Sequence, residues 1–140
     1  MMNETQIAII KKSWRFFRSI DPAVVGDAFY SKLFMDNPVL RKMFPSRMEE
    51  QYKKLMDMLN TIIARLDNLD ALNEDIIAMA QRHVQYGVRP AHYKLVGAAL
   101  LWTLQQGLGP EWTPEVKEAW SSCYNKLSAV MIAASGKQSV

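Results

Sequence analysis

The sequence predicts an all-α fold, and three observations support this prediction. Every strongly periodic stretch places apolar residues three or four positions apart, the spacing of one face of an α-helix. Only six glycines and six prolines occur among 140 residues, and most of them lie between the periodic stretches. Residues that favour helix starts stand where several stretches begin. With so few turn residues, the many short strands of a sandwich or barrel are not expected.

The first two helices each begin at a recognisable capping residue. Asn3, with Gln6 three residues later, resembles a capping box that satisfies free N–H groups of the first turn. Asp21 followed by Pro22 is typical of a second helix start. The residues expected to face inward are Ile7, Ile10, Trp14 and Phe17 on the first helix and Val25, Phe29 and Leu33 on the second.

A short helical turn and a long helix are expected next. The turn begins at Asn37-Pro38 and ends near Phe44, because the residue before Pro45 avoids helical geometry. The long helix runs from about residue 48 to residue 66. Its expected inward face consists of Leu55, Leu59, Ile62 and Leu66.

Three more helices complete the prediction. Residues 67–72 are polar and turn-like, and a helix then runs from about 73 to 86, where Gly87 fits a C-terminal stop. Pro90 opens a helix through Leu108, and Thr113-Pro114 caps the last one. The inward residues are Ile76, Met79, Ala80 and His83, then Tyr93, Val96, Leu100 and Leu104, and finally Val116, Trp120, Tyr124, Leu127 and Met131.

Composition excludes several classes of protein. The length fits one domain, residues 1–140. Cys123 is the only cysteine, so no internal disulfide can form and a reducing compartment is expected. For Cys123 itself, a buried apolar role is favoured over the role of a nucleophile. The first residues lack the layout of a signal peptide, and the longest apolar run, 95–104, is too short for a bilayer. A net charge of +3 gives little support for nucleic-acid binding. We therefore expect a cytoplasmic protein without a membrane span.

The two histidines are the candidates for chemistry. His92 lies in the first turn of its helix, which favours an exposed or capping role. His83 shares an apolar face with Met79 and Ala80, and no cysteine or second histidine lies three or four positions from it, which disfavours zinc. One interpretation is a core histidine satisfied by a hydrogen bond. The other is an axial ligand of haem iron, because the macrocycle itself supplies four ligands.

Several segments resemble one protein family in the right order. Residues 82–97, which contain His83, resemble the proximal segment of bacterial single-domain haemoglobins and of flavohaemoglobin globin domains. Residues 29–34, and Asn37-Pro38 followed by Phe44, resemble the second and third helices of the same family. The resemblance covers nearly the whole chain. It implies a globin fold with a haem b pocket between the distal helix, which carries Gln51, and the proximal helix, which carries His83.

The resemblance also implies residue roles. His83 matches the iron ligand, Phe44 the ring that packs on the haem, Tyr30 and Gln51 the groups that contact bound dioxygen, and Tyr93 the tyrosine that contacts the proximal histidine. Leu55, Leu59, Met79, Val88, Val96 and Tyr124 are expected to line the haem as well, and Arg47, Lys54, Arg82 and Arg89 are candidates for contacts with its propionates.

Alternatives remain for the distal residues. Tyr30 also fits a core phenol bonded to a carbonyl, and Gln51 a solvated helix residue. Since the segment between Phe44 and Gln51 is about two residues shorter than in flavohaemoglobins, Glu50 is a rival for the distal position.

The proximal side departs from the flavohaemoglobin pattern. Ser135 stands where the family has a glutamate that completes a histidine–tyrosine–glutamate network. A carboxylate partner raises the basicity of a histidine ligand, so its loss argues for a plainer, less peroxidase-like site. The chain also ends where a flavohaemoglobin continues into its flavin and nicotinamide domains.

These features leave three functions. The first is reversible dioxygen binding at ferrous haem for storage or transport, with tight binding and slow release. The second is nitric oxide dioxygenase activity with a separate reductase. The third is a signalling module of globin fold without haem. The expected partners are dioxygen and other diatomic gases such as nitric oxide and carbon monoxide, in a monomer or homodimer.

Overall fold

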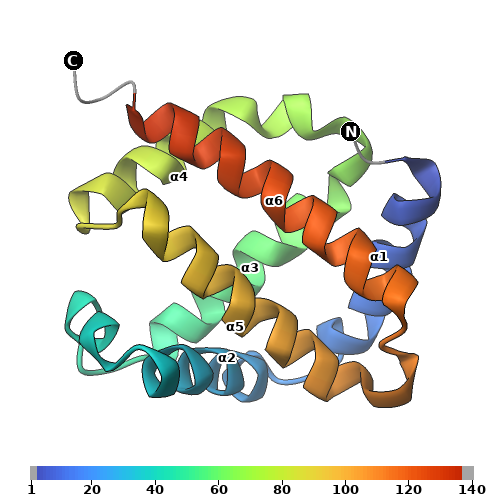
Figure 1. The fold of residues 1–140 in the computed structure, drawn as a ribbon, viewed down its shortest axis with the longest axis horizontal. Helices are drawn as coiled ribbons and strands as arrows, with labels where there is room; N and C mark the ends of the chain where they lie inside the picture. Colours follow the sequence, from blue (N-terminus) through green and yellow to red (C-terminus); the bar gives the residue numbers. More distant parts are fainter. Residues whose placement is uncertain (1–2, 137–140) are drawn as a thin grey trace.

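The computed structural model describes residues 3–136, nearly all of which lie in helices joined by short turns (Figure 1). No strand occurs in this range, which confirms the predicted fold class. The elements are α1 (Glu4–Arg18), α2 (Pro22–Asp36), the 3-10 helix η1 (Pro38–Met43), α3 (Glu49–Ala64), the 3-10 helix η2 (Leu66–Leu72), α4 (Asn73–Gln85), α5 (Pro90–Leu108), the 3-10 helix η3 (Gly109–Glu111) and α6 (Pro114–Gly136).

Several of the predicted helix starts have capping bonds. At α1, the Asn3 side chain accepts a hydrogen bond from the Gln6 N–H at 2.8 Å, and the Gln6 side chain accepts one from the Asn3 N–H at 3.4 Å. At α2, Asp21 accepts a bond from the Ala23 N–H at 2.9 Å. At α5, the Arg89 N–H donates to Nδ1 of His92 at 3.0 Å. His92 is therefore a capping residue, as its place in the sequence indicates.

The segment after the long helix differs from the prediction. Helix α3 ends at Ala64 rather than Leu66, and residues 66–72 form η2 instead of a polar turn. Leu66 and Leu72 are buried and Leu69 is half-buried. These leucines lie three positions apart, which is the repeat of a 3-10 helix, so they share one inward side. The leucine spacing was the signal for η2 that the prediction missed.

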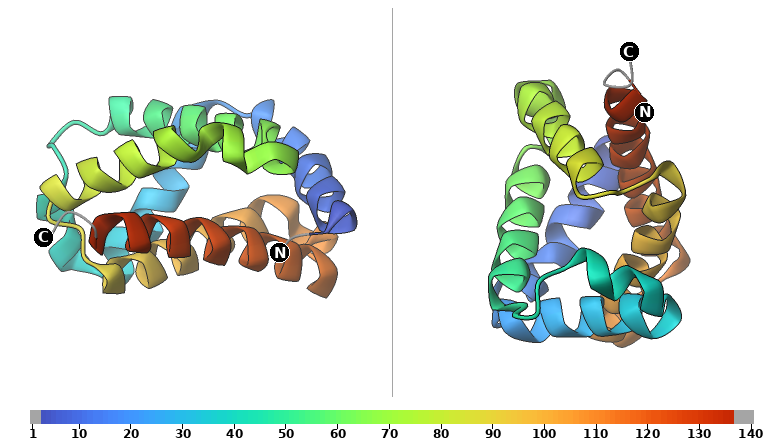
Figure 2. Two further views of the ribbon diagram at one scale, coloured as in Figure 1. Left: turned by 90° about the horizontal axis from the view of Figure 1, so that it is seen from above. Right: turned by 90° about the vertical axis from the view of Figure 1, so that its left-hand side faces the viewer.

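The helices form two layers that enclose the core. Seen from above, α3 and α4 lie in one layer and α5 and α6 in the other (Figure 2). Helix α2 packs across both α3 and α5, and α6 packs along α4, α1 and α5. By contrast, α3 and α4 contact other helices but hardly each other. A cleft lies between these two helices.

Two buried tryptophans tie α1 to both layers. The Trp14 indole N–H donates to Oδ1 of Asn60 on α3 at 2.7 Å, and the Trp120 indole N–H on α6 donates to Oγ of Ser13 at 2.9 Å. Each indole thus buries its rings while its polar N–H is satisfied. These bonds fix the end of the molecule opposite to the turn between α4 and α5 (Figure 1).

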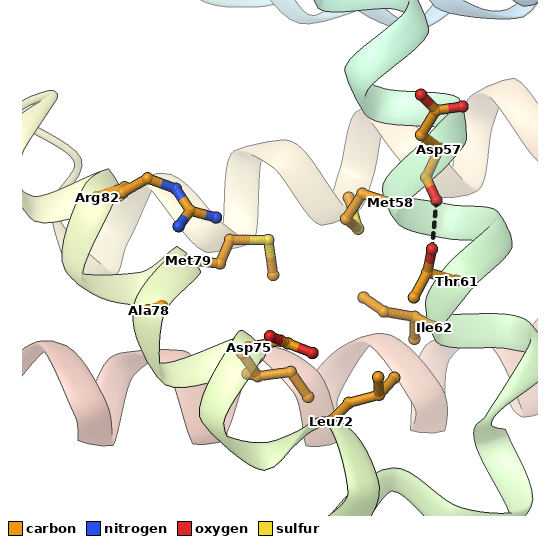
Figure 3. A pocket seen from close by; sticks show the side chains of 10 residues that line it. Asp57, Met58, Thr61, Ile62, Leu72, Asp75, Ala78, Met79 and Arg82 are labelled. Carbon is orange, nitrogen blue, oxygen red and sulfur yellow. Dashed lines mark hydrogen bonds between the residues drawn. The ribbon is translucent and has the colours of Figure 1, made fainter.

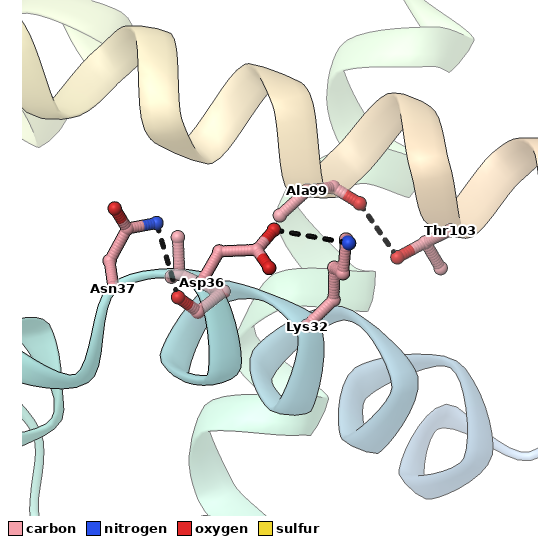
Figure 4. A network of polar contacts seen from close by, with 6 residues as sticks. Lys32, Asp36, Asn37, Ala99 and Thr103 are labelled. Atoms are coloured by element: carbon pink, nitrogen blue, oxygen red, sulfur yellow. Dashed lines mark hydrogen bonds and ion pairs between the residues drawn. The ribbon is translucent and has the colours of Figure 1, made fainter.

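A close approach at Gly26 sets the register between α2 and α3. A Cβ at this position would lie 2.6 Å from Cβ of Tyr52, so only glycine allows the two backbones to come so near. Farther along α2, Lys32 pairs with Asp36 at 3.2 Å (Figure 4). The Lys32 ammonium also lies 5.3 Å from the centroid of the Trp102 ring on α5. Helix α2 is thereby fixed against both layers.

None of the described helices has the length and apolar character needed to cross a bilayer.

Candidate functional site

A cleft of about 340 Å³ separates α3 from α4. We call it the α3–α4 cleft. Its walls are mainly apolar, and Met58 and Met79 point into it from opposite sides (Figure 3). Charged and polar groups, Asp57, Asp75 and Arg82, occur among its lining residues. The full lining is Asp57, Met58, Thr61, Ile62, Leu72, Asp75, Ile76, Ala78, Met79 and Arg82.

His83 lies in the last turn of α4, next to Arg82 and one turn after Met79. Its Nδ1 is 2.7 Å from the carbonyl oxygen of Met79. A carbonyl can only accept, so Nδ1 carries the proton and donates, and Nε2 keeps its lone pair. Burial lowers the pKa of His83, which favours the neutral ring. A half-buried, neutral imidazole with one anchored nitrogen and one free nitrogen is well suited to hold a metal.

The turn after α4 fixes the end of the helix that carries His83. Gly87 has a φ of +89°, and its N–H donates to the carbonyl of Val84 at 3.0 Å. The N–H of Val88 then donates to the carbonyl of His83 itself at 3.0 Å. A glycine in the left-handed region ends the helix here as the sequence predicts, and Val88 is half-buried against the core.

On α2, Tyr30 lies within a group of aromatic rings. The centroid of its ring is 5.9 Å from that of Phe34, 5.4 Å from that of Phe44 and 6.0 Å from that of Tyr52. Burial, together with the nearby Tyr52, raises the pKa of Tyr30 to about 12, so the phenol keeps its proton. Within residues 3–136 the tyrosine hydroxyls that form hydrogen bonds are those of Tyr52 and Tyr124, not that of Tyr30. Tyr30 therefore offers a donor without a protein partner.

The register of α3 distinguishes Gln51 from Glu50. Tyr52 faces α2 at Gly26. Gln51 is half-buried and shares a helical face with Leu55, one turn later, which lines an internal cavity. Glu50 is exposed and shares its face with Lys54, which is exposed too. The geometry favours Gln51 as the residue that faces the interior.

Comparison with known proteins adds a second line of information. The sequence model of the globin family matches residues 27–131 of this chain. This chain belongs to the globin family.

Relatives of this globin occur in several bacteria. It is 31% identical over 135 residues to a flavohemoprotein of Vibrio cholerae and 28% identical over 135 residues to one of Bacillus subtilis. Each alignment covers 94% of this chain but 34% of the relative, so the globin spans about a third of their length. An uncharacterised globin-like protein of Aquifex aeolicus is 30% identical over 132 residues, 94% of this chain and 93% of that protein.

Solved structures resemble the globin over its whole length. An engineered carbene transferase from Rhodothermus marinus, also named as a candidate nitric oxide dioxygenase, superposes with a TM-score of 0.87 at 25% identity, covering 98% of this chain and 95% of the other. A bacterial globin from Campylobacter jejuni gives a TM-score of 0.85 at 27% identity, with coverage of 97% and 98%.

Four of the predicted lining residues of the globin meet around a second cavity. This inner cavity of about 60 Å³ lies among α2, α3, α5 and α6 and has an apolar lining. Leu55, Leu59, Val96 and Tyr124 are among its lining residues. Met79 lines the α3–α4 cleft instead, whereas Phe44, Val88 and Tyr93 line neither space. Met58 and Ile62 line both spaces. Met58 was not among the predicted lining residues, although its position one turn after Leu55 places it on the same side of α3.

Tyr93, on α5, has an unusual environment. Tyr93 is buried, and its hydroxyl has no hydrogen-bond partner within residues 3–136. Burial raises the pKa of Tyr93, and nearby Ser135 lowers this pKa in part. The Ser135 hydroxyl donates its own hydrogen bond to the carbonyl of Met131 at 2.8 Å. The backbone carbonyl of Tyr93 accepts a bond from the hydroxyl of Tyr124. Because Met79 already anchors Nδ1 of His83, Tyr93 is not the partner of that nitrogen.

Proposed function

We propose that this globin holds haem b between α3 and α4 and binds dioxygen reversibly. The observation that carries the proposal is the state of His83, whose Nδ1–H donates to Met79 and whose Nε2 is left with a free lone pair. A histidine that binds a metal through Nε2 needs this tautomer, and the hydrogen bond to Met79 fixes the direction of the ring. The mainly apolar walls of the α3–α4 cleft suit a flat hydrophobic group.

The charges around the cleft favour one orientation of the cofactor. Arg82 lines the cleft next to His83, while Asp57 and Asp75 also line it. The propionates of a haem are anions, so we expect Arg82 to attract them and the two carboxylates to repel them. Of the four basic residues considered for this role, Arg82 is the one that lines the cleft.

When bound, ferrous haem supplies the iron at which a diatomic gas coordinates. The protein would then hold the iron through Nε2 of His83 and donate hydrogen bonds to the bound gas. Tyr30 and Gln51 are the proposed donors. Tyr30 keeps its proton and lacks a protein partner, and Gln51 is half-buried on the same face of α3 as Leu55. A hydrogen bond to a ligand that carries negative charge contributes about 1.5–3 kcal/mol. Each such bond slows release roughly tenfold to a hundredfold.

Absorption spectroscopy of the reconstituted protein tests this proposal. Haemin is added to the purified chain, and ferric, ferrous and oxygenated spectra are recorded and followed through autoxidation. We expect a Soret band, a stable oxygenated form and slow dissociation of dioxygen. A chain that gives no Soret band with haemin would instead support the signalling module without haem.

A second candidate function is nitric oxide dioxygenase. It is favoured by the likeness to flavohemoproteins and to the Rhodothermus marinus protein that is named for this activity. In that reaction nitric oxide and dioxygen give nitrate, and a reductase must return one electron to the iron after each turnover. Steady nitrate production with an added reductase would support this function, whereas simple oxygen equilibrium with negligible turnover supports the first. The serine at position 135, in place of a carboxylate, favours oxygen binding because the proximal histidine then lacks that source of basicity.

A further inference from the structure

Arg41, near the end of η1, holds the loop that follows it. Its guanidinium donates to three consecutive backbone carbonyls, those of Phe44 at 3.3 Å, Pro45 at 2.9 Å and Ser46 at 3.1 Å. Arginine can do this because its planar fork presents several donors in fixed directions. Among the side chains described, no carboxylate forms an ion pair with it. Its donors are therefore directed to the loop.

The same guanidinium covers an aromatic ring. Its central carbon lies 5.4 Å from the centroid of Phe34, a distance at which a cation attracts the face of a ring. Phe34 and Phe44 also contact each other, with ring centroids 5.3 Å apart. Arg41 thus fixes the backbone of one phenylalanine and packs on the ring of the other.

These two phenylalanines are neighbours of Tyr30. The Tyr30 ring stacks on Phe34 with an interplanar angle of 28° and meets Phe44 at 65°. Within residues 3–136 no hydrogen bond holds the Tyr30 hydroxyl, so the packing of its ring sets the direction in which that hydroxyl points. Arg41 contacts the ring of Phe34 and the backbone of Phe44.

We propose that Arg41 is a positioning residue that orients the Tyr30 hydroxyl and so sets the preference of the site for dioxygen over carbon monoxide. This inference rests on the proposed function. A hydrogen bond weakens steeply as its angle departs from linear, so a Tyr30 ring that is free to tilt is a poorer donor. Dioxygen on ferrous haem is a strong acceptor and carbon monoxide a weak one, so the loss affects dioxygen selectively.

The test compares Arg41→Met, Arg41→Lys and Lys42→Met in the haem-loaded protein. Methionine keeps most of the length of the side chain but removes its donors, and lysine keeps a charge without the planar fork. Lys42 is an exposed neighbour in η1 and serves as the matched control. Dissociation rates of dioxygen and carbon monoxide, the infrared stretching frequency of bound carbon monoxide and the midpoint of urea unfolding are measured for each protein.

We expect Arg41→Met to release dioxygen about fivefold faster or more and carbon monoxide less than twofold faster, with a shifted carbon monoxide stretch. Arg41→Lys should be intermediate, and Lys42→Met should match the wild type. Equal acceleration of both gases, or lower unfolding stability with unchanged dissociation and stretch, would overturn the positioning role and leave the proposed function standing. A wild-type protein that takes up no haem would overturn both.

A further variant covers the case in which Arg41→Met does not fold. Phe34→Leu removes the ring that Arg41 covers while leaving the loop bonds in place. It should accelerate dioxygen release selectively in the same way. Unchanged dioxygen release in Phe34→Leu, together with unchanged release in Arg41→Lys, would contradict the inference.

Discussion

The Nδ1 atom of His83 lies 2.7 Å from the carbonyl oxygen of Met79, one helical turn earlier. This contact determines which nitrogen is protonated, and it leaves the other nitrogen able to bind a metal. It also explains why a histidine can occupy a partly apolar helix face without an unsatisfied N–H group. The roles proposed for Tyr30 and Gln51 depend on this histidine holding the iron.

The first prediction concerns Tyr30. Tyr30→Phe removes the proposed hydrogen-bond donor but keeps the ring, so we expect dioxygen to dissociate about 10- to 100-fold faster. Stopped-flow mixing of the oxygenated protein with carbon monoxide measures the rate. Tyr52→Phe is the control, because the Tyr52 hydroxyl donates to Asp27 at 3.4 Å on the surface. Rates for Tyr30→Phe within twofold of the wild type would remove the proposed role of Tyr30.

The second prediction concerns the approach of α2 to α3. Gly26→Ala places a Cβ 2.6 Å from Cβ of Tyr52, and we expect this overpacking to lower the free energy of unfolding by about 1–3 kcal/mol. Tyr52→Gly makes room for the added methyl group. In urea titrations the double variant should therefore lose less stability than the sum of the two single variants. Additive losses would show that the two positions are not in contact.

The third prediction concerns Cys123, whose thiol is buried on α6. Burial raises the pKa of Cys123 to about 11, although nearby Lys126 lowers it in part. The folded protein should react very slowly with a disulfide reagent at pH 8, because the thiolate is the reactive form. The chain unfolded in about 8 M urea should react readily, because its thiol is then exposed. Rapid reaction of the folded protein would contradict the burial of this thiol.

The same shift predicts a loss of stability at alkaline pH. The unfolded chain ionises Cys123 at a lower pH than the folded chain does, so the unfolded state binds fewer protons in that window. The contribution to stability is complete below the unfolded pKa and is lost as the pH rises toward about 11. Between pH 8 and pH 10.5 the wild type should lose more unfolding free energy than Cys123→Ala. Equal losses in the two proteins would show that this thiol does not contribute.

Much of the fold could be predicted from local signals in the chain. The caps at Asn3 and Asp21, the apolar stripes and the stop at Gly87 act over one or two turns, and the structure has them where the sequence indicates. The helical structure of residues 66–72 was not predicted, because the polar residues of the segment indicated a turn. Its three leucines follow the repeat of a 3-10 helix rather than that of an α-helix.

The candidate site was less accessible to sequence reasoning. The pattern around His83 suggested a ligand or a satisfied core histidine, and only the structure identifies Met79 as the partner of Nδ1. The role of Arg41 depends on loop carbonyls and two rings, and no spacing of residues marks such contacts. The inner cavity could not be predicted either, because its lining residues come from four helices that are far apart in the sequence and meet only in the fold.

Haem binding by His83→Gly, with and without added imidazole, tests the central claim most directly. Imidazole can enter the space left by the missing side chain and replace its free nitrogen, while His92→Ala, at a capping histidine, controls for loss of any histidine. We predict that His83→Gly loses the Soret spectrum and gas affinity of the wild type, that imidazole restores them, and that His92→Ala keeps them. A His83→Gly protein that retains the wild-type spectrum and gas affinity without imidazole would contradict the account.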